Sequence, residues 1–180
     1  MTRDLYQDVQ EATRRHRQHH GCGAYTYSDG SLPGVIAAAM DARRIVEVGT
    51  ALGYTALWLA HHHRDTEVDT IESDPDHVQL ARQQIDSHGR SRSITVHAGR
   101  AEQILTSLPL GQYDMAFFDG FSPTADLIHQ LRELLRPGGV LLSANLTLGG
   151  AQEALSRLAD PTQWLTHSFG ETALAVKLPT

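Results

Sequence analysis

The chain has 180 residues and a formal net charge of -6 at pH 7, with 41% hydrophobic and 20% charged residues. This length predicts one domain, since single domains run to roughly 100–200 residues, and a core of that size needs no disulfide or metal for stability. The acidic balance disfavours a nucleic-acid partner, and no apolar run approaches the roughly 18–20 residues that cross a bilayer, so we expect no membrane partner.

The residue content also indicates a compartment. One cysteine, Cys22, excludes a disulfide within the chain and is typical of a reducing environment. The N-terminus lacks the apolar segment of a secretion signal, so we expect a cytoplasmic protein. The only local basic cluster, residues 14–17 (RRHR), predicts a solvated helix face rather than a binding site.

The predicted elements begin with residues 1–27, which form an exposed helix to about His20 and then a loop within a single domain of residues 1–180. The loop prediction rests on the glycines and prolines of residues 21–34 (GCGAYTYSDGSLPG). A short apolar helix is expected over residues 34–40 (GVIAAAM), directly before the first strand.

Strand-like and helix-like segments then alternate. The strands are expected at residues 45–48, 68–72, 93–98, 115–119 and 140–144, and each is nearly continuous in apolar residues. Such runs are typical of a parallel sheet covered by helices on both faces. Asp74 and Pro75 predict the start of one intervening helix, and "RPGG" (residues 136–139) ends another.

The end of the chain has a different pattern. "WLTHSF" and "TALAVKL" are strand-like and are separated only by Gly170 and Glu171, which predicts an antiparallel hairpin. The expected fold is therefore a doubly wound, mostly parallel α/β sheet of seven strands with an antiparallel C-terminal hairpin. Residues 61–63 (HHH) predict an exposed helix end, because three consecutive side chains point in different directions and cannot form one metal site.

A glycine-containing turn follows the first strand in "RIVEVGTALGYTALWLA", residues 44–60. Gly49 ends the strand and Gly53 opens the next helix, so a ligand can lie directly against the backbone. The loop lacks the G-x-G-x-x-G pattern of a pyrophosphate site, because position 51 is Ala and position 54 is Tyr. Glu72 ends the second strand, nineteen residues after Gly53, where a carboxylate accepts ribose hydroxyls. This combination predicts an adenosine ligand without a pyrophosphate, such as S-adenosylmethionine.

Several motifs together resemble class I S-adenosylmethionine-dependent methyltransferases, specifically the catechol and caffeoyl-coenzyme A O-methyltransferase-like group. The resemblance runs from about Ser28 to Lys177. The segments that carry it are "VEVGTALGYTALWLA", "IESDPDHVQLAR", "HAGRAEQIL", "YDMAFFDG", "LLRPGGVLLSAN" and "FGETALAVK". The resemblance implies the Rossmann-like fold of that group and a homodimer.

The resemblance also implies a role for individual positions. The methionine end of the cofactor would lie against the first motif, which contributes Glu47, Gly49, Thr50, Ala51 and Gly53. Tyr54 belongs to the same motif but is expected to pack beneath the loop. Glu72 would bind the ribose with Ser73 beside it, and the adenine would be bordered by Gly99, Arg100 and Ala101. Asp119 would lie near the transferred methyl group, as a cofactor contact and a catalytic residue.

The chain departs from the group at its metal site. Metal-dependent members bind a divalent cation such as Mg²⁺ through one Asp after the fourth strand and an Asp-Asn pair after the fifth. Here Asp119 and Asn145 remain as candidate metal ligands, but Ala144 replaces the second Asp. Ser122 stands where the group carries a basic Lys, and the replacement bases that remain as candidates are His97, His129 and His167.

These departures leave three interpretations open. The first is methyl transfer to a hydroxyl of a small molecule, with an incomplete metal site. The second is an N- or S-methyltransferase that needs no metal, and the third is a cofactor-binding protein without transferase activity. The segment between Asn145 and the final hairpin and the N-terminal region, which help to cover the substrate in that group, are short here, which predicts an open site or one completed by a second subunit.

Overall fold

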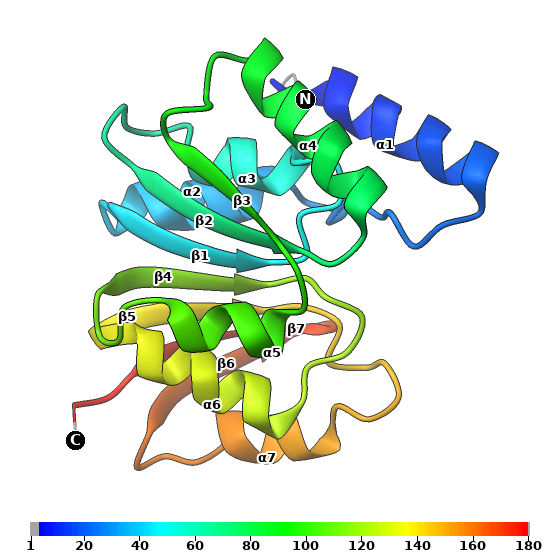
Figure 1. The fold of residues 1–180 in the computed structure, drawn as a ribbon. Helices are drawn as coiled ribbons and strands as arrows, with labels where there is room; N and C mark the ends of the chain where they lie inside the picture. The colour runs from blue at the N-terminus through cyan, green and yellow to red at the C-terminus, as the bar shows by residue number, and fades with distance from the viewer. Residues whose placement is uncertain (1–3, 180) are drawn as a thin grey trace.

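The computed structural model describes residues 4–179 and contains one seven-stranded sheet with helices on both faces (Figure 1). The strand order is β3-β2-β1-β4-β5-β7-β6. The bounds are β1 Arg44–Val48, β2 Glu67–Glu72, β3 Ile94–Ala98, β4 Tyr113–Phe118, β5 Leu135–Ser143, β6 Trp164–Phe169 and β7 Thr172–Lys177. The first five strands are parallel, and β7 runs antiparallel to both β5 and β6. The predicted doubly wound sheet with a C-terminal hairpin is confirmed.

The helices divide between the two faces of the sheet (Figure 1). One face is covered by α1 Gln7–His20, α2 Ser31–Ala39, α3 Tyr54–Leu59 and α4 Pro75–Ser87, and the other by α5 Ala101–Ile104, the 3-10 turn η1 Leu105–Ser107, α6 Ala125–Leu134 and α7 Gln152–Leu158. Neighbouring strand residues contribute to opposite cores, since Ile45 packs in the first and Val46 in the second. This alternation follows from the two-residue period of a strand.

Helix α4 starts as predicted. The Asp74 side chain accepts hydrogen bonds from the backbone N–H groups of Asp76 (2.9 Å) and His77 (3.2 Å), and Pro75 occupies the first helical position. The buried face of the helix comprises His77, Val78, Ala81 and Ile85. Because this helix follows β2 directly, its first turn lies beside the end of that strand.

Three elements differ from the sequence-based expectation. Helix α1 is not exposed on all sides, because Val9 and Thr13 are fully buried against the first core. Helix α2 begins at Ser31, before the predicted start at residue 34. Pro33 is tolerated there because it lies in the first turn, where its missing N–H would have no partner within the helix. Strand β5 begins at Leu135 rather than at residue 140, with a register shift where it passes the "RPGG" segment.

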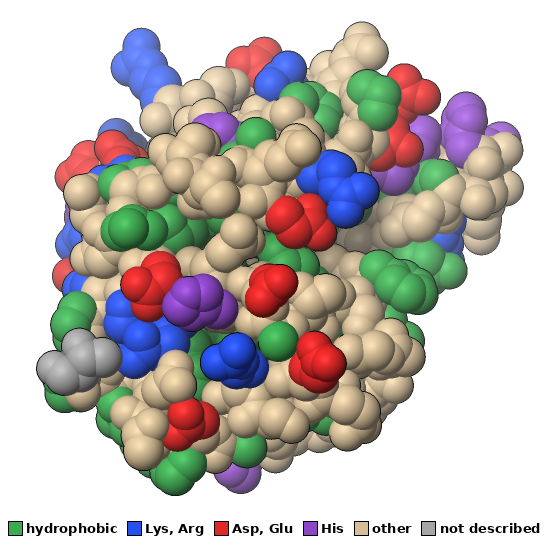
Figure 2. Space-filling model, turned by 60° about the horizontal axis from the view of Figure 1, so that its bottom comes forward, with side chains coloured by type: hydrophobic (Ala, Val, Ile, Leu, Met, Phe, Trp, Pro, Cys, Tyr) green, Lys and Arg blue, Asp and Glu red, His purple; other side chains and the backbone are tan. Residues whose placement is uncertain are grey.

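The predicted domain, residues 1–180, extends slightly beyond the described part, since residues 1–3 and 180 lie outside it. The histidine run of residues 61–63 follows α3, and its His61 side chain hydrogen-bonds to the Tyr6 hydroxyl (3.0 Å). Across residues 4–179, every helix falls short of the length and apolarity that crossing a bilayer would require. The face turned forward in Figure 2 carries acidic and basic side chains next to one another.

Candidate functional site

The candidate site lies where the parallel strands end, around the central strand β1. The order of the sheet reverses at β1, because β2 and β3 lie on one side of it and β4 and β5 on the other. Backbone hydrogen bonds connect the strand ends: the Gly49 N–H donates to Ile71 O (3.0 Å) and the Asp119 N–H to Val48 O (2.8 Å). The sheet thus brings the loop after β1 beside the ends of β2 and β4.

The glycine loop adopts a conformation that side chains disfavour. Gly49 has a φ of +99°, and a Cβ on it would lie 2.5 Å from the backbone oxygen of Asp119. Gly53 has a φ of +93° and opens α3, although a Cβ there would make only ordinary contacts, 3.4 Å from the Ile85 side chain and 3.8 Å from Ala81 O. Gly49 is therefore required by both conformation and space, whereas Gly53 is required mainly by conformation.

Glu72 links the glycine loop to the end of β2. Its Oε2 accepts a hydrogen bond from the Ala51 N–H (2.9 Å), and its Oε1 accepts from the N–H groups of Ser73 (2.8 Å) and Asp74 (2.9 Å). The side chain is only 12% exposed. A carboxylate offers about four lone-pair sites, so one remains on Oε2 for a further donor. The glycine loop, the end of β2 and the start of α4 are therefore held together by hydrogen bonds to one carboxylate.

Glu47 occupies a buried polar network beneath the loop. It is fully buried, and its two carboxylate oxygens accept hydrogen bonds from the hydroxyls of Thr55 and Thr70, the second at 2.5 Å. Thr70 in turn lies 2.6 Å from the Thr50 hydroxyl. Burial raises the pKa of the Glu47 carboxyl to about 8, although the two threonine hydroxyls oppose this change. Thr55 and Thr70 were not singled out from the sequence, where isolated threonines carry no spacing signal.

The remaining predicted cofactor residues lie around the same edge. Tyr54 is buried below the loop, as expected, and its hydroxyl donates to Asp4 (2.5 Å). Gly99 follows β3 and donates its N–H to Glu72 O (2.8 Å), and Arg100 is exposed at the start of α5. Ala101 begins that helix. The structure thus brings the residues after β1, β2, β3 and β4 to one edge, as the motifs predict.

Asp119 is mostly buried at the end of β4. Burial raises the pKa of its carboxyl to about 7, and the charge of Glu171 acts in the same direction while the hydrogen bond from Asn145 opposes it. Asn145 has a left-handed backbone (φ 61°) and donates its side-chain N–H to Asp119 Oδ1 (3.2 Å) and to Gly120 O (2.6 Å). Asp119 is therefore a carboxyl group whose charge changes near neutral pH.

This arrangement does not fit a divalent cation. Gly120 O is an acceptor only, so the amide nitrogen of Asn145 must face it, and the same nitrogen faces Asp119. Ala144, which is 1% exposed, adds no oxygen between them. A hard cation such as Mg²⁺ requires several oxygen ligands. The metal ligands predicted at Asp119 and Asn145 remain a prediction, and we derive no catalytic step through a metal.

The candidate bases other than Asp119 lie in other settings. His97 Nε2 lies 2.7 Å from Asp69 Oδ1, and the Tyr113 hydroxyl donates to the second oxygen of Asp69 (2.7 Å). His129 and His167 are exposed on α6 and β6. The Ser122 hydroxyl is buried and has no hydrogen-bond partner among the described residues. Ser122 therefore has no neighbour that would activate it as a base.

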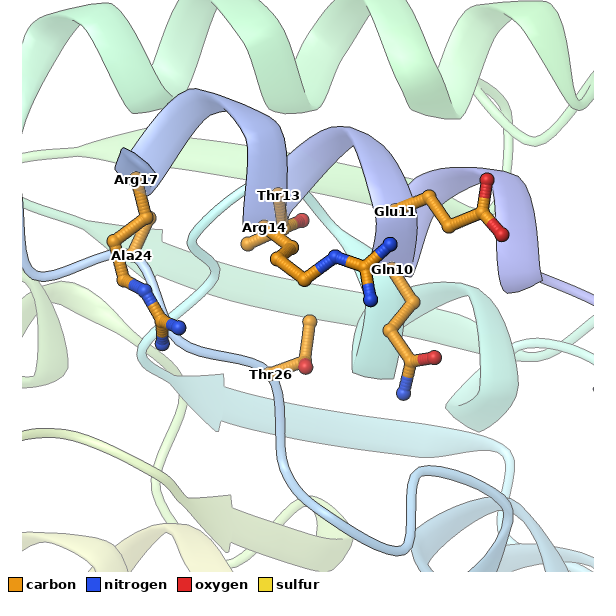
Figure 3. A pocket seen from close by; sticks show the side chains of 7 residues that line it. All are labelled: Gln10, Glu11, Thr13, Arg14, Arg17, Ala24 and Thr26. Atoms are coloured by element: carbon orange, nitrogen blue, oxygen red, sulfur yellow. The ribbon is translucent and has the colours of Figure 1, made fainter. Parts of the chain in front are cut away.

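A hollow of about 290 Å³ lies beside α1 (Figure 3). Its lining residues come from α1 and from the segment that follows it: Gln10, Glu11, Thr13, Arg14, Arg17, Ala24 and Thr26. The Arg17 guanidinium lies over the exposed ring of Tyr25, 4.1 Å from its centroid. Tyr27 continues this segment toward the sheet edge, where its hydroxyl lies 3.1 Å from that of Thr172.

Known proteins share this sequence and architecture. A family model described as "Methyltransferase domain" matches residues 46–146, from β1 to just beyond β5. The chain belongs to this methyltransferase family. A "Putative O-methyltransferase" of Mycolicibacterium smegmatis is 36% identical over 173 residues, which cover 89% of this chain and 79% of that protein. One from Mycobacterium sp. (strain JLS) is 36% identical over 142 residues, covering 77% of this chain and 64% of the relative.

The chain thus spans less than two thirds of the length of some relatives of this methyltransferase family. A solved structure has the same fold: the O-methyltransferase TomG from Streptomyces achromogenes, in complex with SAM, superposes with a TM-score of 0.82. It is 24% identical in sequence, and the match covers 98% of this chain and 96% of TomG. The Rossmann-like methyltransferase fold expected from the motifs is confirmed.

Proposed function

We propose that this protein transfers the methyl group of S-adenosylmethionine to a hydroxyl group of a small molecule. The observation that carries the proposal is Glu72, whose carboxylate at the end of β2 accepts the Ala51 N–H and retains a lone pair on Oε2. In a chain of the methyltransferase family, this is a ribose-binding carboxylate held against a glycine loop. The structure of TomG in complex with SAM supports the same cofactor for this fold.

The residues at the sheet edge fit an adenosine cofactor. Gly49 leaves open backbone where a Cβ would collide with Asp119 O, and Gly99, Arg100 and Ala101 follow β3 where the adenine would lie. Glu72 would accept a ribose hydroxyl at the free position of Oε2, with Ser73 beside it. Glu47, which is fully buried, would support the methionine end indirectly by holding Thr55 at the start of α3. When bound, S-adenosylmethionine supplies a methyl group on a positively charged sulfur.

Asp119 is the group that we propose to act as the base. Its carboxyl has a pKa of about 7 because it is buried, so it changes between proton donor and acceptor near neutral pH. The hydroxyl proton of the acceptor moves to the Asp119 carboxylate while the acceptor oxygen forms a bond to the methyl carbon. The bond from that carbon to sulfur breaks, which leaves a methyl ether and S-adenosylhomocysteine. Asn145 holds the carboxylate in place by its hydrogen bond.

One observation favours a second acceptor class. The amide nitrogen of Asn145 and the methyl group of Ala144 stand where a cation would need oxygen atoms. An amine or thiol acceptor requires no metal to become nucleophilic, so N- or S-methylation agrees with this arrangement as well. The homodimer implied by the family resemblance remains a prediction.

Cofactor binding can be tested by calorimetric titration with S-adenosylmethionine. We expect Glu72→Gln to weaken binding by roughly tenfold to a hundredfold, since a hydrogen bond to a charged group contributes about 1.5–3 kcal/mol. The matched control is Glu67→Gln, which changes an exposed glutamate at the opposite end of the same strand. Equal affinity of the Glu72 variant and the natural protein would refute the ribose assignment.

Transfer itself can be tested with labelled S-adenosylmethionine and a panel of phenols, amines and thiols, once with magnesium and once with a chelator. Label transferred to phenols under both conditions would support the proposal. Transfer to amines or thiols alone would replace the hydroxyl acceptor with the second class. Cofactor binding without transfer to any class in the panel would contradict the proposed activity and favour a binding protein.

A further inference from the structure

Three potential metal ligands from separate parts of the chain meet between α1 and the first turn of α4. They are His16 on α1, Cys22 in the segment after α1, and His77 in the first turn of α4. One donor atom from each lies within 4.8 Å of the other two. None of these residues takes part in the proposed methyl transfer, and the cluster is independent of that proposal.

The spacing resembles that of a zinc centre. His77 Nε2 lies 3.4 Å from Cys22 Sγ. Two ligands of a tetrahedral zinc ion, with bonds of about 2.0 Å to nitrogen and 2.3 Å to sulfur, lie about 3.5 Å apart. His77 is only 5% exposed, whereas His16 and Cys22 are partly exposed, so the cluster is buried on the side of His77 and open to solvent on the other side. Thiolate and imidazole ligands together select zinc over the hard cations.

The same helix offers a fourth candidate, His20, although it is not among the three residues whose donor atoms lie within 4.8 Å of one another. His20 follows His16 by four residues, and their rings stack with centroids 4.5 Å apart. Histidines at i and i+4 lie on one helix face and bind zinc together in known metal sites. The helix then ends at Gly21, whose left-handed φ of 61° turns the chain and directs Cys22 toward α4. The sequence "HRQHHGC", residues 16–22, thus contains three of the four ligands.

We propose that His16, Cys22 and His77, joined by His20 after rotation of its side chain, form a Zn²⁺ site that connects α1 to α4. The Nδ1 of His77 lies 4.0 Å from Glu72 Oε1, which is beyond hydrogen-bond distance but places a carboxylate on this side of the ring. Binding of the metal at Nε2 requires the proton to reside on Nδ1, which faces this carboxylate. Zinc-bound histidines commonly direct their other ring nitrogen to a carboxylate in this way. The site is expected to hold α1 against the domain.

The proposal can be tested on protein without a purification tag, stripped with a chelator and titrated with Co²⁺. We expect one equivalent to bind with the intense visible bands of a tetrahedral ion and a thiolate charge-transfer band in the near ultraviolet. Zn²⁺ should displace the cobalt and raise the Tm of the protein. Cys22→Ser should remove the thiolate band.

Substitutions can distinguish the contribution of each proposed ligand to Co²⁺ binding from that of the other histidines. Loss of a group that only orients a metal ligand typically lowers metal affinity by roughly tenfold or more. Loss of a ligand itself should cost at least as much, so His16→Gln and His77→Gln should each weaken Co²⁺ affinity by at least roughly tenfold. The matched control is His19→Gln, on the same helix, because His19 is exposed and its Nδ1 lies 2.7 Å from Arg15 O. This variant should bind Co²⁺ as the natural protein does.

Three results would overturn the proposal. The first is cobalt binding without a thiolate band, which would place the ion at a site that lacks Cys22. The second is an equal loss of affinity in the His19 and His16 variants. The third is the absence of one-equivalent binding. Because His16 is partly exposed, its variant should retain the apo-protein Tm, and this keeps the test independent of folding.

Discussion

Replacing Gly49 and Gly53 separately with alanine tests the construction of the loop after β1. The two glycines have nearly the same φ, +99° and +93°. An alanine at either position incurs the conformational cost of about 1–2 kcal/mol. Only at Gly49 does the new Cβ collide with backbone, at 2.5 Å from Asp119 O, whereas at Gly53 it makes ordinary contact with Ile85 at 3.4 Å.

The Asp119 N–H is hydrogen-bonded to Val48 O, so moving Asp119 away would disturb this contact between β1 and β4. The ends of β1 and β4 must therefore separate, and overpacking of this kind costs about a further 1–3 kcal/mol. We expect Gly53→Ala to lower the free energy of unfolding by about 1–2 kcal/mol and Gly49→Ala by about 2–5 kcal/mol.

Urea unfolding of both variants measures this difference directly, and the Gly53 variant serves as the control for strain without collision. If the two free energies of unfolding fell by the same amount, within about 0.5 kcal/mol, the close approach of Gly49 to Asp119 would not contribute to stability. The reasoning from the Cβ distance would then be refuted.

Three further predictions concern charge at the same edge. The rate of methyl transfer should rise with pH through about 7 as Asp119 ionises, and Asp119→Asn should remove this dependence and lower the rate by about 10²–10⁴; an unchanged profile would exclude Asp119 as the base. Because the pKa of Glu47 rises on folding from 4.5 to about 8, the native state retains a proton that the unfolded state releases, so stability falls as pH increases across this interval. Glu47→Gln should make that fall less steep in urea unfolding measured at several pH values, and an identical slope would contradict the assignment. Ala144→Asp should let Mg²⁺ raise the Tm, an effect expected to be smaller in the natural protein; no Mg²⁺ effect on the variant would show that the predicted ligand alignment is wrong.

Local sequence signals predicted the elements and the edge of the sheet that carries the site. Apolar runs predicted the strands, and Asp74 followed by Pro75 predicted the start of α4, because a cap and a proline act within one turn. Gly49 and Glu72 were identified from their spacing along the sequence. Because β1 and β2 are adjacent and parallel, the ends of these strands also lie together in the fold. These features depend on neighbours in the chain, which a sequence displays directly.

The sequence by itself thus determined the doubly wound sheet with its C-terminal hairpin and the glycine loop with Glu72, since these follow from periodicity and spacing, and the resemblance to known methyltransferases supplied the other candidate cofactor residues. Only the tertiary structure decided the state of the carboxyl groups and of the histidines. The pKa of Glu47 depends on its complete burial with Thr55 and Thr70, and the juxtaposition of Cys22 and His77 requires two segments 55 residues apart to pack together. Burial and long-range contact depend on how helices pack against the sheet, and no local pattern records that geometry.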